Sequence, residues 1–231
     1  MANVFKATDE LFVALDVVGQ VATSLTEVNA LIPANLPMTN AVSCASVVLL
    51  SGYFESFLKD IVAEFVGQLN LLRKPLTSLP YEMRIKHFDS GGRALSWASK
   101  QDKKLQGSAH SENLAIRLAS LSDPANYEFA WEAFADTRAN PGPEVVKDIL
   151  SGLQIQKSWG EINSLVTKHG QLQTFLTAFI EMRNVCAHTG HHTSPPTGAM
   201  IADFTVKFKA LAECIDLLMG VKFDEFRALP P

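Results

Sequence analysis

Apolar residues recur at spacings of three and four along four long stretches of the chain, which is the period of an amphipathic α-helix. These stretches cover about residues 8–31, 39–71, 171–188 and 199–221. Proline-containing segments follow the first two stretches, and proline disrupts a helix interior. No stretch alternates apolar and polar residues as a half-buried strand does. The pattern predicts an all-α fold in the form of an antiparallel four-helix bundle.

The segment between the second and third stretches, about residues 75–169, has a weaker period. It predicts additional short helices inserted in the middle of the bundle. Short helices or turns are expected around Asp89–Gly92. Asp123, followed by Pro124, has the pattern of an N-cap and a first-turn proline, which predicts a helix over residues 125–137.

Two further helices are expected in the same segment. Proline is favoured in a first turn, so Pro143 should open a helix through Leu153, and Gly170 should end one over Glu161–His169. With 47% hydrophobic and 19% charged residues, the chain has the composition of a folded protein and not of a disordered one. We therefore expect one domain over residues 1–231, with the middle segment inserted into it.

The apolar pattern predicts neither export nor a membrane span. Asp9, Glu10 and Asp16 interrupt the first apolar stretch, which argues against a signal peptide. The longest apolar stretch, residues 41–66, carries charged residues and does not predict a transmembrane helix. These features predict a cytoplasmic protein with no membrane partner. The cysteines lie in apolar helical patterns and are expected to be buried and reduced; they are Cys44, Cys186 and Cys214.

Charge is unevenly distributed along the chain. The formal net charge of -4 does not indicate nucleic-acid binding, but residues 73–104 contain eight basic residues against three acidic ones. A locally basic strip attracts phosphate groups even when the whole chain is acidic. On charge alone, a solvated surface is the simpler interpretation. The candidate RNA-binding residues of the strip are Arg84, Lys86, Arg93, Lys103 and Lys104.

The third long helix is expected to end on the sequence Arg183-Asn184-Val185-Cys186-Ala187-His188. Its arginine, amide and histidine supply a fixed positive charge, an orienting group and a proton shuttle, which suffice for RNA cleavage without a metal. At about 100° per residue, Arg183 falls on the apolar face of the helix. A guanidinium there must be paired or line a polar cleft.

His188 follows Arg183 by five positions, which places it roughly 140° further round a regular helix. One regular helix therefore does not aim both side chains at the same cleft. Either the helix frays near Gly190 and lets His188 swing round, or a second copy of the chain brings its own motif across a subunit interface. A capping histidine beside an arginine whose stem packs on apolar surface would explain the same residues without catalysis.

The residues Arg183–His188 match the R-x4-6-H motif of the HEPN superfamily (higher eukaryotes and prokaryotes nucleotide-binding domain). Residues 47–60 resemble the long early helix of the bacterial HEPN branch that includes the RiboL-PSP-type domains. The resemblance covers these helices better than residues 74–171. It implies a HEPN-like bundle and a metal-independent endoribonuclease that uses no cofactor.

The resemblance also implies a reaction and an assembly. The 2′-hydroxyl of RNA would attack the adjacent phosphate and leave a 2′,3′-cyclic phosphate and a 5′-hydroxyl. Arg183 would stabilise the phosphorane, His188 would act as general base or acid, and Asn184 would hold His188 or the phosphate. The paired motifs of a homodimer would form one composite active site.

The implied cellular role is that of a toxin or an anti-phage defence effector, with an antitoxin or a defence-system protein as a further partner. In some HEPN toxins a tyrosine stands two positions after the histidine, but Gly190 stands there in this chain. This departure weighs against the toxin–antitoxin subclass and not against the chemistry.

Three residues are candidates for a supporting role. Glu55 either orients Arg183 or His188, or forms an i,i+4 ion pair with Lys59. Tyr53 either stacks on a base or packs in the bundle, and packing is the more common role of such a residue. His191, in the loop after the third helix, would contact RNA together with His192.

The motif region permits two other interpretations. A zinc site made of Cys186, His188, His191 and His192 matches no standard zinc framework, so no metal site is predicted. The alternative to catalysis is a non-catalytic helical module that binds a protein or a nucleotide, as an inactive HEPN partner would. That alternative predicts no nuclease activity.

Overall fold

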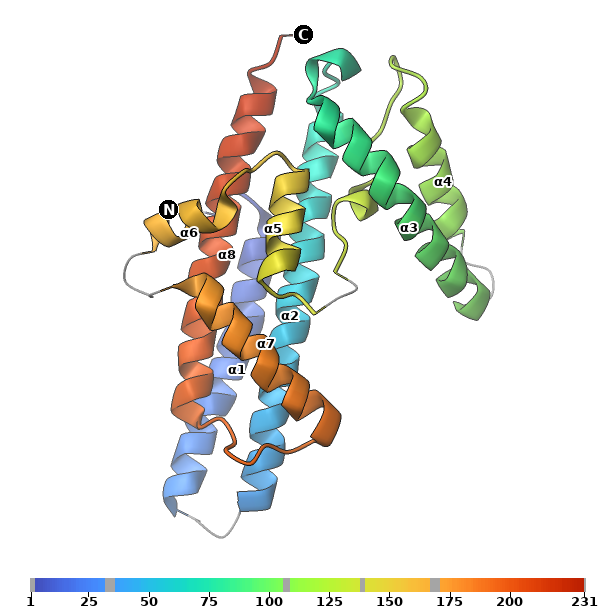
Figure 1. Cartoon of the computed structure of the whole chain (residues 1–231). Coiled ribbons are helices and arrows are strands. Elements are labelled where there is room, and N and C mark those ends of the chain that lie inside the picture. Colours follow the sequence, from blue (N-terminus) through green and yellow to red (C-terminus); the bar gives the residue numbers. More distant parts are fainter. Residues whose placement is uncertain (1–2, 32–35, 106–108, 138–139, 167–170, 231) are drawn as a thin grey trace.

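Three long helices form the body of the molecule in the computed structural model, which describes residues 3–31, 36–105, 109–137, 140–166 and 171–230. These helices are α1 (Lys6–Leu31), α2 (Leu36–Leu71) and α8 (Gly198–Arg227), and α1 runs against the other two (Figure 1). A fourth helix, α7 (Leu172–Thr189), crosses them obliquely and contacts α2 and α8. The described residues contain no β-strand, so the predicted all-α bundle is confirmed.

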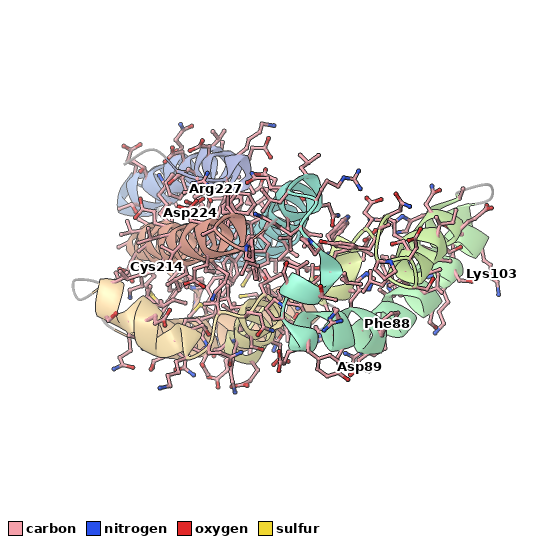
Figure 2. All side chains as sticks on the ribbon, turned by 90° about the horizontal axis from the view of Figure 1, so that it is seen from above. Phe88, Asp89, Lys103, Cys214, Asp224 and Arg227 are labelled. Carbon is pink, nitrogen blue, oxygen red and sulfur yellow. The ribbon has the colours of Figure 1, made fainter. Side chains whose placement is uncertain are left out.

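The middle segment contributes two groups of helices. The first is α3 (Tyr81–Leu105) and α4 (His110–Ser120), which pack on each other and project to one side of the bundle. Viewed from above, Lys103 lies near the tip of this projection (Figure 2). We refer to the described residues between 81 and 137 as the arm. The second group covers the bundle beside α7 and consists of α5 (Pro143–Gly152) and α6 (Ser158–Leu165).

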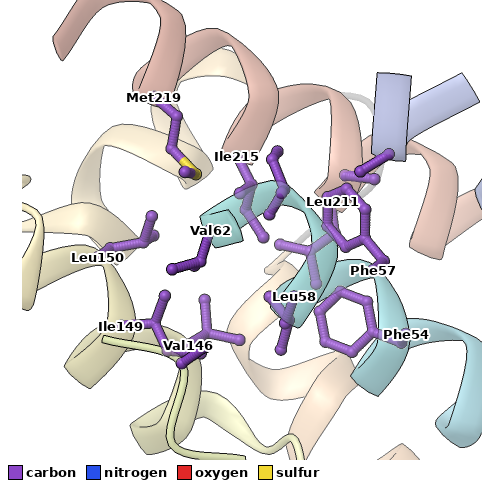
Figure 3. Close-up of a cluster of buried hydrophobic side chains, with 14 of the residues drawn as sticks. Phe54, Phe57, Leu58, Val62, Val146, Ile149, Leu150, Leu211, Ile215 and Met219 are labelled. Atoms are coloured by element: carbon purple, nitrogen blue, oxygen red, sulfur yellow. The ribbon is translucent and has the colours of Figure 1, made fainter. Parts of the chain in front are cut away.

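The bundle core is rich in large side chains. The ring of Phe208 on α8 lies 4.9 Å from that of Phe54 on α2 and 4.7 Å from that of Phe179 on α7, centroid to centroid. All three are buried. Nearby, aliphatic side chains of α2, α5 and α8 converge, including Leu58, Leu150 and Ile215 (Figure 3). Because burial of apolar surface is the dominant favourable term in folding, this core fixes α2, α7 and α8 relative to one another.

Two carboxylates fix the start of α1. The buried side chain of Asp216 on α8 accepts hydrogen bonds from Val4 N (2.8 Å), Phe5 N (3.0 Å) and Thr8 Oγ1 (2.7 Å). Glu64 on α2 accepts from the next two backbone N–H groups, at 2.9 and 3.0 Å. A helix N-terminus has unpaired N–H groups and a partial positive charge, so these carboxylates stabilise α1 and attach it to both neighbours.

The most apolar helix of the chain, α2, lies at the centre of the bundle. Among the described residues, Pro37–Leu71 is long and apolar enough to cross a membrane, and half of its most apolar window is buried inside the structure. Packing against α1, α7 and α8 accounts for that apolar character. Cys44 on α2 is buried, as are Cys186 and Cys214, and all three thiols are free, as predicted.

The turns predicted around Asp89–Gly92 are wrong, because α3 continues without a break through this sequence. Gly91 faces α4, and a Cβ added there would overlap the side chain of Leu118. The glycine therefore allows α3 and α4 to approach closely and does not end the helix.

The helix predicted over residues 125–137 is also wrong: only Trp131–Ala133 form a short 3-10 helix, η3. Asp123 makes a turn instead of a cap, accepting from Ala125 N at 3.1 Å and from Asn126 Nδ2 at 2.9 Å. The following backbone is paired by side chains from elsewhere. Asn70 binds both N and O of Phe129, and His87 Nε2 accepts from Ala130 N at 2.8 Å. These tertiary hydrogen bonds replace those of a helix.

Helix ends differ from the predictions by a few residues elsewhere. The α8 helix continues to Arg227, because Phe226 is buried and its ring lies 6.1 Å from that of Phe65. The last inserted helix, α6, begins at Ser158 and ends at Leu165. The predicted end at His169 and Gly170 lies outside the described residues.

Candidate functional site

A cleft of about 670 Å³ opens between the arm, α2 and α7. On the bundle side it is lined by Arg183 of α7 and by Glu55 and Lys59 of α2. Side chains of the segment that leads from the arm to α5 border it too, among them Thr137 and Asn140. The arm side is mainly apolar and aromatic; its lining includes Ala94, Trp97, His110, Leu114, Trp131 and Glu132.

Arg183 contributes an uncompensated positive charge to this cleft. Its side chain is half-buried, its Nε is buried without a hydrogen-bond partner, and Nη1 makes only a 3.4 Å contact to Asn184 Oδ1. Among the described residues no carboxylate forms an ion pair with Arg183; Glu55, which lines the same cleft, pairs with Lys59 (2.7 Å). A guanidinium without an internal counter-charge at the wall of a cleft is suited to bind an anion from solution.

Asn184 is held beside Arg183 by a second asparagine. Its Oδ1 accepts a hydrogen bond from Asn140 Nδ2 at 2.6 Å, in addition to the contact with Arg183. No hydrogen bond joins Asn184 to His188 in the described part of the chain. The amide of Asn184 is therefore oriented on the Arg183 side of α7.

His188 lies on a different side of α7 from Arg183. The helix remains regular to Thr189, and Gly190 ends it with a φ of 68°, a left-handed conformation that suits glycine. The expected fraying before Gly190 is therefore wrong. His188 is exposed and does not line the cleft. The other expectation, a second copy that supplies the missing group, stays a prediction.

The supporting candidates have separate surroundings. Glu55 lines the cleft, forms the predicted ion pair with Lys59, and accepts a hydrogen bond from Thr137 Oγ1 at 3.2 Å. Tyr53 is half-buried and packs against the hydrophobic core. His191 is exposed beyond the end of α7, where its Nδ1 lies 3.0 Å from Thr189 O. Neither of the last two lines the cleft.

The four residues considered for zinc are not arranged around one point. His188 and His191 are exposed, whereas Cys186 is buried. Burial and the neighbouring Cys44 thiol raise the pKa of Cys186 to about 12, so it remains a protonated core thiol. The backbone of His192 is bound to the side chain of Asn40 on α2, which attaches the loop to the bundle. Over the described ranges no three His, Cys, Asp or Glu residues are grouped to hold a metal ion.

The basic candidates all lie on α3, but not on one face. Arg84 is half-buried and stacks over Tyr81 (5.3 Å from guanidinium carbon to ring centroid). Lys86 and Arg93 line a hollow between α3 and α5. Lys103 and Lys104 are exposed at the end of the helix. At about 100° per residue, one side of α3 carries Lys86, Arg93, Trp97, Lys100 and Lys104.

Buried polar contacts hold the arm wall of the cleft in place. His87 is fully buried, and its Nε2 accepts the Ala130 N–H. Burial, with the nearby charge of Arg117, lowers the pKa of His87 to about 4, so the ring is neutral near pH 7. Arg117 in turn forms an ion pair with Glu132 at 2.5 Å. These contacts position η3, and with it Trp131, against α3.

The sequence pattern indicates Arg183 and Glu55, but most of the other residues that line the cleft carry no clear signal. Trp97, Trp131, Thr137 and Asn140 come from segments without a clear motif. Asn140 precedes Pro141 and Gly142, so its signal is that of a turn. Trp97 offered a weak signal, because a large aromatic residue lies among basic residues on the exposed part of an amphipathic helix.

The fold and the cleft define an all-α bundle protein with an arginine, unpaired with any described carboxylate, at a cleft near the end of a core helix. The RiboL-PSP-HEPN family model matches residues 23–220, and the chain belongs to this family. The resemblance seen in Arg183–His188 and in residues 47–60 is thus confirmed. Comparisons with curated proteins and with solved structures gave no match. Membership of the family points to a nuclease or another RNA-related function.

Proposed function

We propose that the protein is a metal-independent endoribonuclease that leaves 2′,3′-cyclic phosphate and 5′-hydroxyl ends. The observation that carries this proposal is the uncompensated guanidinium of Arg183 in the cleft. A buried or half-buried charge without a partner is costly to the folded protein. Binding of an RNA phosphate to the Arg183 guanidinium would offset this cost. Family membership supports the same choice of substrate.

In this mechanism Arg183 neutralises the negative charge that develops on the phosphorane. Asn184 assists, because Asn140 and Arg183 both approach its Oδ1 and leave its Nδ2 to donate to a phosphate oxygen. His188 accepts the proton of the 2′-hydroxyl or donates one to the leaving 5′-oxygen. An imidazole suits either step because its unperturbed pKa is near neutrality.

The separation of Arg183 and His188 on α7 favours a site completed by a second protomer. Their side chains lie roughly 140° apart round the helix, and only Arg183 lines the cleft. We therefore propose a homodimer whose paired motifs meet in one composite cleft, where Arg183 of each subunit acts with His188 of the other. His188 is exposed, so it is accessible to such a partner.

We extend this proposal to the path of the RNA over the protein and to the role of the protein in the cell. Arg84, Lys86, Arg93, Lys103 and Lys104 on α3 would attract the RNA backbone beside the cleft. A ribonuclease of this kind would act in the cytoplasm as a toxin or an anti-phage defence effector. An antitoxin or another defence-system protein would then restrain it.

The test is cleavage of total RNA in the presence of EDTA by the wild type, Arg183→Ala and His188→Ala. Glu181→Ala, which removes another exposed side chain from α7, is the matched control and should cleave normally. Both motif variants should be inactive, whereas a mixture of the two should regain about a quarter of wild-type activity by random assortment of subunits. Wild-type cleavage by both motif variants would remove the motif from the mechanism.

A second function is favoured by one observation, the absence of His188 from the described lining of the cleft. A non-catalytic helical module would use the cleft to bind a nucleotide or a protein. It predicts that no RNA is cleaved and that binding persists in His188→Ala but weakens in Arg183→Ala.

A further inference from the structure

The arm side of the cleft has the chemistry of a nucleobase site. We propose that it binds one unpaired base of the RNA, stacked on Trp97, while Arg183 holds a phosphate at the bundle side. The inference rests on the proposed RNA substrate and adds a recognition subsite to it. It makes the protein selective for single-stranded or looped RNA.

Trp97 has no packing role that accounts for its position. Its side chain is 47% exposed, although it belongs to the least polar part of the cleft lining. Trp131 is half-buried and lines the same space from η3, with Ala94 and Leu114 completing the apolar wall. An aromatic ring beside an apolar wall is the surface on which proteins stack single-stranded bases.

Glu132 supplies a hydrogen-bond acceptor to which a base can donate. Its side chain is only 10% exposed, and its Oε1 is bound by Arg117 at 2.5 Å. The second oxygen, Oε2, is buried and has no hydrogen-bond partner among the described residues. A buried acceptor without a hydrogen-bond partner destabilises the folded protein, and the amino group of a base can donate a hydrogen bond to it. Adenine, cytosine and guanine carry such a group, whereas uracil presents carbonyl oxygens on both sides of its N–H.

The charges around the cleft fit a single strand threaded along α3. Arg93, Lys100 and Lys104 share one side of the helix with Trp97, so cations alternate with the stacking ring. Arg183 provides positive charge at the opposite wall, where Lys59 is paired with Glu55. The cleft volume of about 670 Å³ falls within the range of roughly 300–1,000 Å³ that is typical of small-molecule sites. A base already stacked inside a duplex does not enter such a site unless it is flipped out.

The experiment measures binding separately from cleavage. Fluorescently labelled oligo(A), oligo(U) and a duplex of equal length are titrated by anisotropy, in EDTA, into the full-length His188→Ala protein. Adding Trp97→Ala should weaken oligo(A) binding about ten-fold or more, and Trp97→Phe should restore most of it. The matched control is Phe88→Ala, because Phe88 also belongs to α3 (Figure 2), is 52% exposed and does not line the cleft.

Three further outcomes decide the proposal. Oligo(A) should bind more tightly than oligo(U), and Glu132→Gln should reduce that difference. The duplex should bind more weakly than either single strand. Equal binding of oligo(A) by Trp97→Ala and its parent, equal binding of duplex and single strand, or no RNA binding at all would overturn the base subsite.

The two proposals fail in different ways. If Arg183→Ala and His188→Ala cleave RNA like the wild type, or if nothing is cleaved, the catalytic proposal fails while the effect of Trp97→Ala on binding still supports the base subsite. If cleavage depends on the motif but Trp97→Ala binds and cleaves single strands normally, only the subsite fails.

Discussion

The bundle and the arm are both helical, but different interactions hold them together. The bundle buries many large side chains, among them Phe54, Phe179 and Phe208. The outer part of the arm has a separate small core of Ala98, Leu114 and Ala130, whereas Phe129 and Phe134 of the arm join the bundle core. The arm relies in addition on polar contacts, such as the Ala130 N–H bound to His87 and the pair Arg117–Glu132.

The cleft lies where these two regions meet. Its Arg183 and Lys59 belong to the strongly packed bundle and Trp131 packs against the bundle core, whereas Trp97 belongs to α3 in the weakly packed part of the arm. Regions with little buried apolar surface open locally at a lower free energy than the core. The bundle wall of the cleft should therefore be rigid, whereas the wall formed by Trp97 should be adjustable.

Phe208→Ala should cause the largest loss of stability. Phe208 is fully buried and contacts the rings of Phe54, Phe175 and Phe179, so its truncation leaves a cavity that α2, α7 and α8 cannot close. We expect the free energy of unfolding to fall by about 4 kcal/mol, measured by urea denaturation followed by circular dichroism. A loss below that of the arm variant Leu114→Ala would contradict the comparison.

A fall in pH should lower the stability of the arm before that of the bundle. The pKa of His87 is lowered from 6.5 to about 4 in the folded protein, so folding favours the neutral ring. The unfolded chain takes up this proton first as pH falls, so the stabilisation is complete above pH 6.5 and is lost towards pH 4. The full loss is about 3 kcal/mol.

Hydrogen exchange at pH 7 and pH 5, with rates corrected for pH, measures this effect residue by residue. Protection of the arm should decrease at pH 5 relative to that of α2 and α8. His87→Gln keeps an acceptor for Ala130 N and removes the titration, so its arm should lose less protection. An equal change in arm and bundle would show that His87 does not govern the arm.

Leu114→Ala should cost about 2 kcal/mol, near the lower end for a buried leucine. Leu114 is fully buried in the arm core, but its neighbours there are mainly alanines and the cleft lies beside it. Exchange should accelerate in α3 and α4 and remain slow in α8. Faster exchange throughout the chain would mean that the arm and the bundle unfold as one unit.

Lys209→Ala should have the smallest effect, about 0.5 kcal/mol. Lys209 on α8 pairs with Asp16 on α1 at 2.5 Å, but the two side chains are 31% and 65% exposed and solvent screens the pair. A double-mutant cycle with Asp16→Ala, measured by urea denaturation, gives the coupling energy. A coupling as large as the effect of Leu114→Ala would show that surface charges, and not only the apolar core, hold the bundle together.

The helices of the bundle are more predictable from the sequence than those of the arm. The long bundle helices have buried residues at helical spacing, so their pattern alone predicted α1, α2, α7 and α8 to within a few residues, except at the end of α8. In the arm, Gly91 and Asp123 gave misleading signals. Gly91 serves close packing inside a helix, and Asp123 closes a turn because Asn70 and His87 bind the backbone that follows. Such contacts come from distant positions and leave no local pattern.

Periodic burial and a short motif are properties of neighbouring residues, so the helical bundle, the motif Arg183–His188 and the family follow from the sequence. Where Arg183 points depends on the tertiary structure. The fold places the guanidinium in a cleft with Trp97, Trp131 and Asn140, away from any ion pair with the described carboxylates, and leaves His188 outside. A cleft forms between elements far apart in the chain, and its charge balance depends on which of their side chains meet.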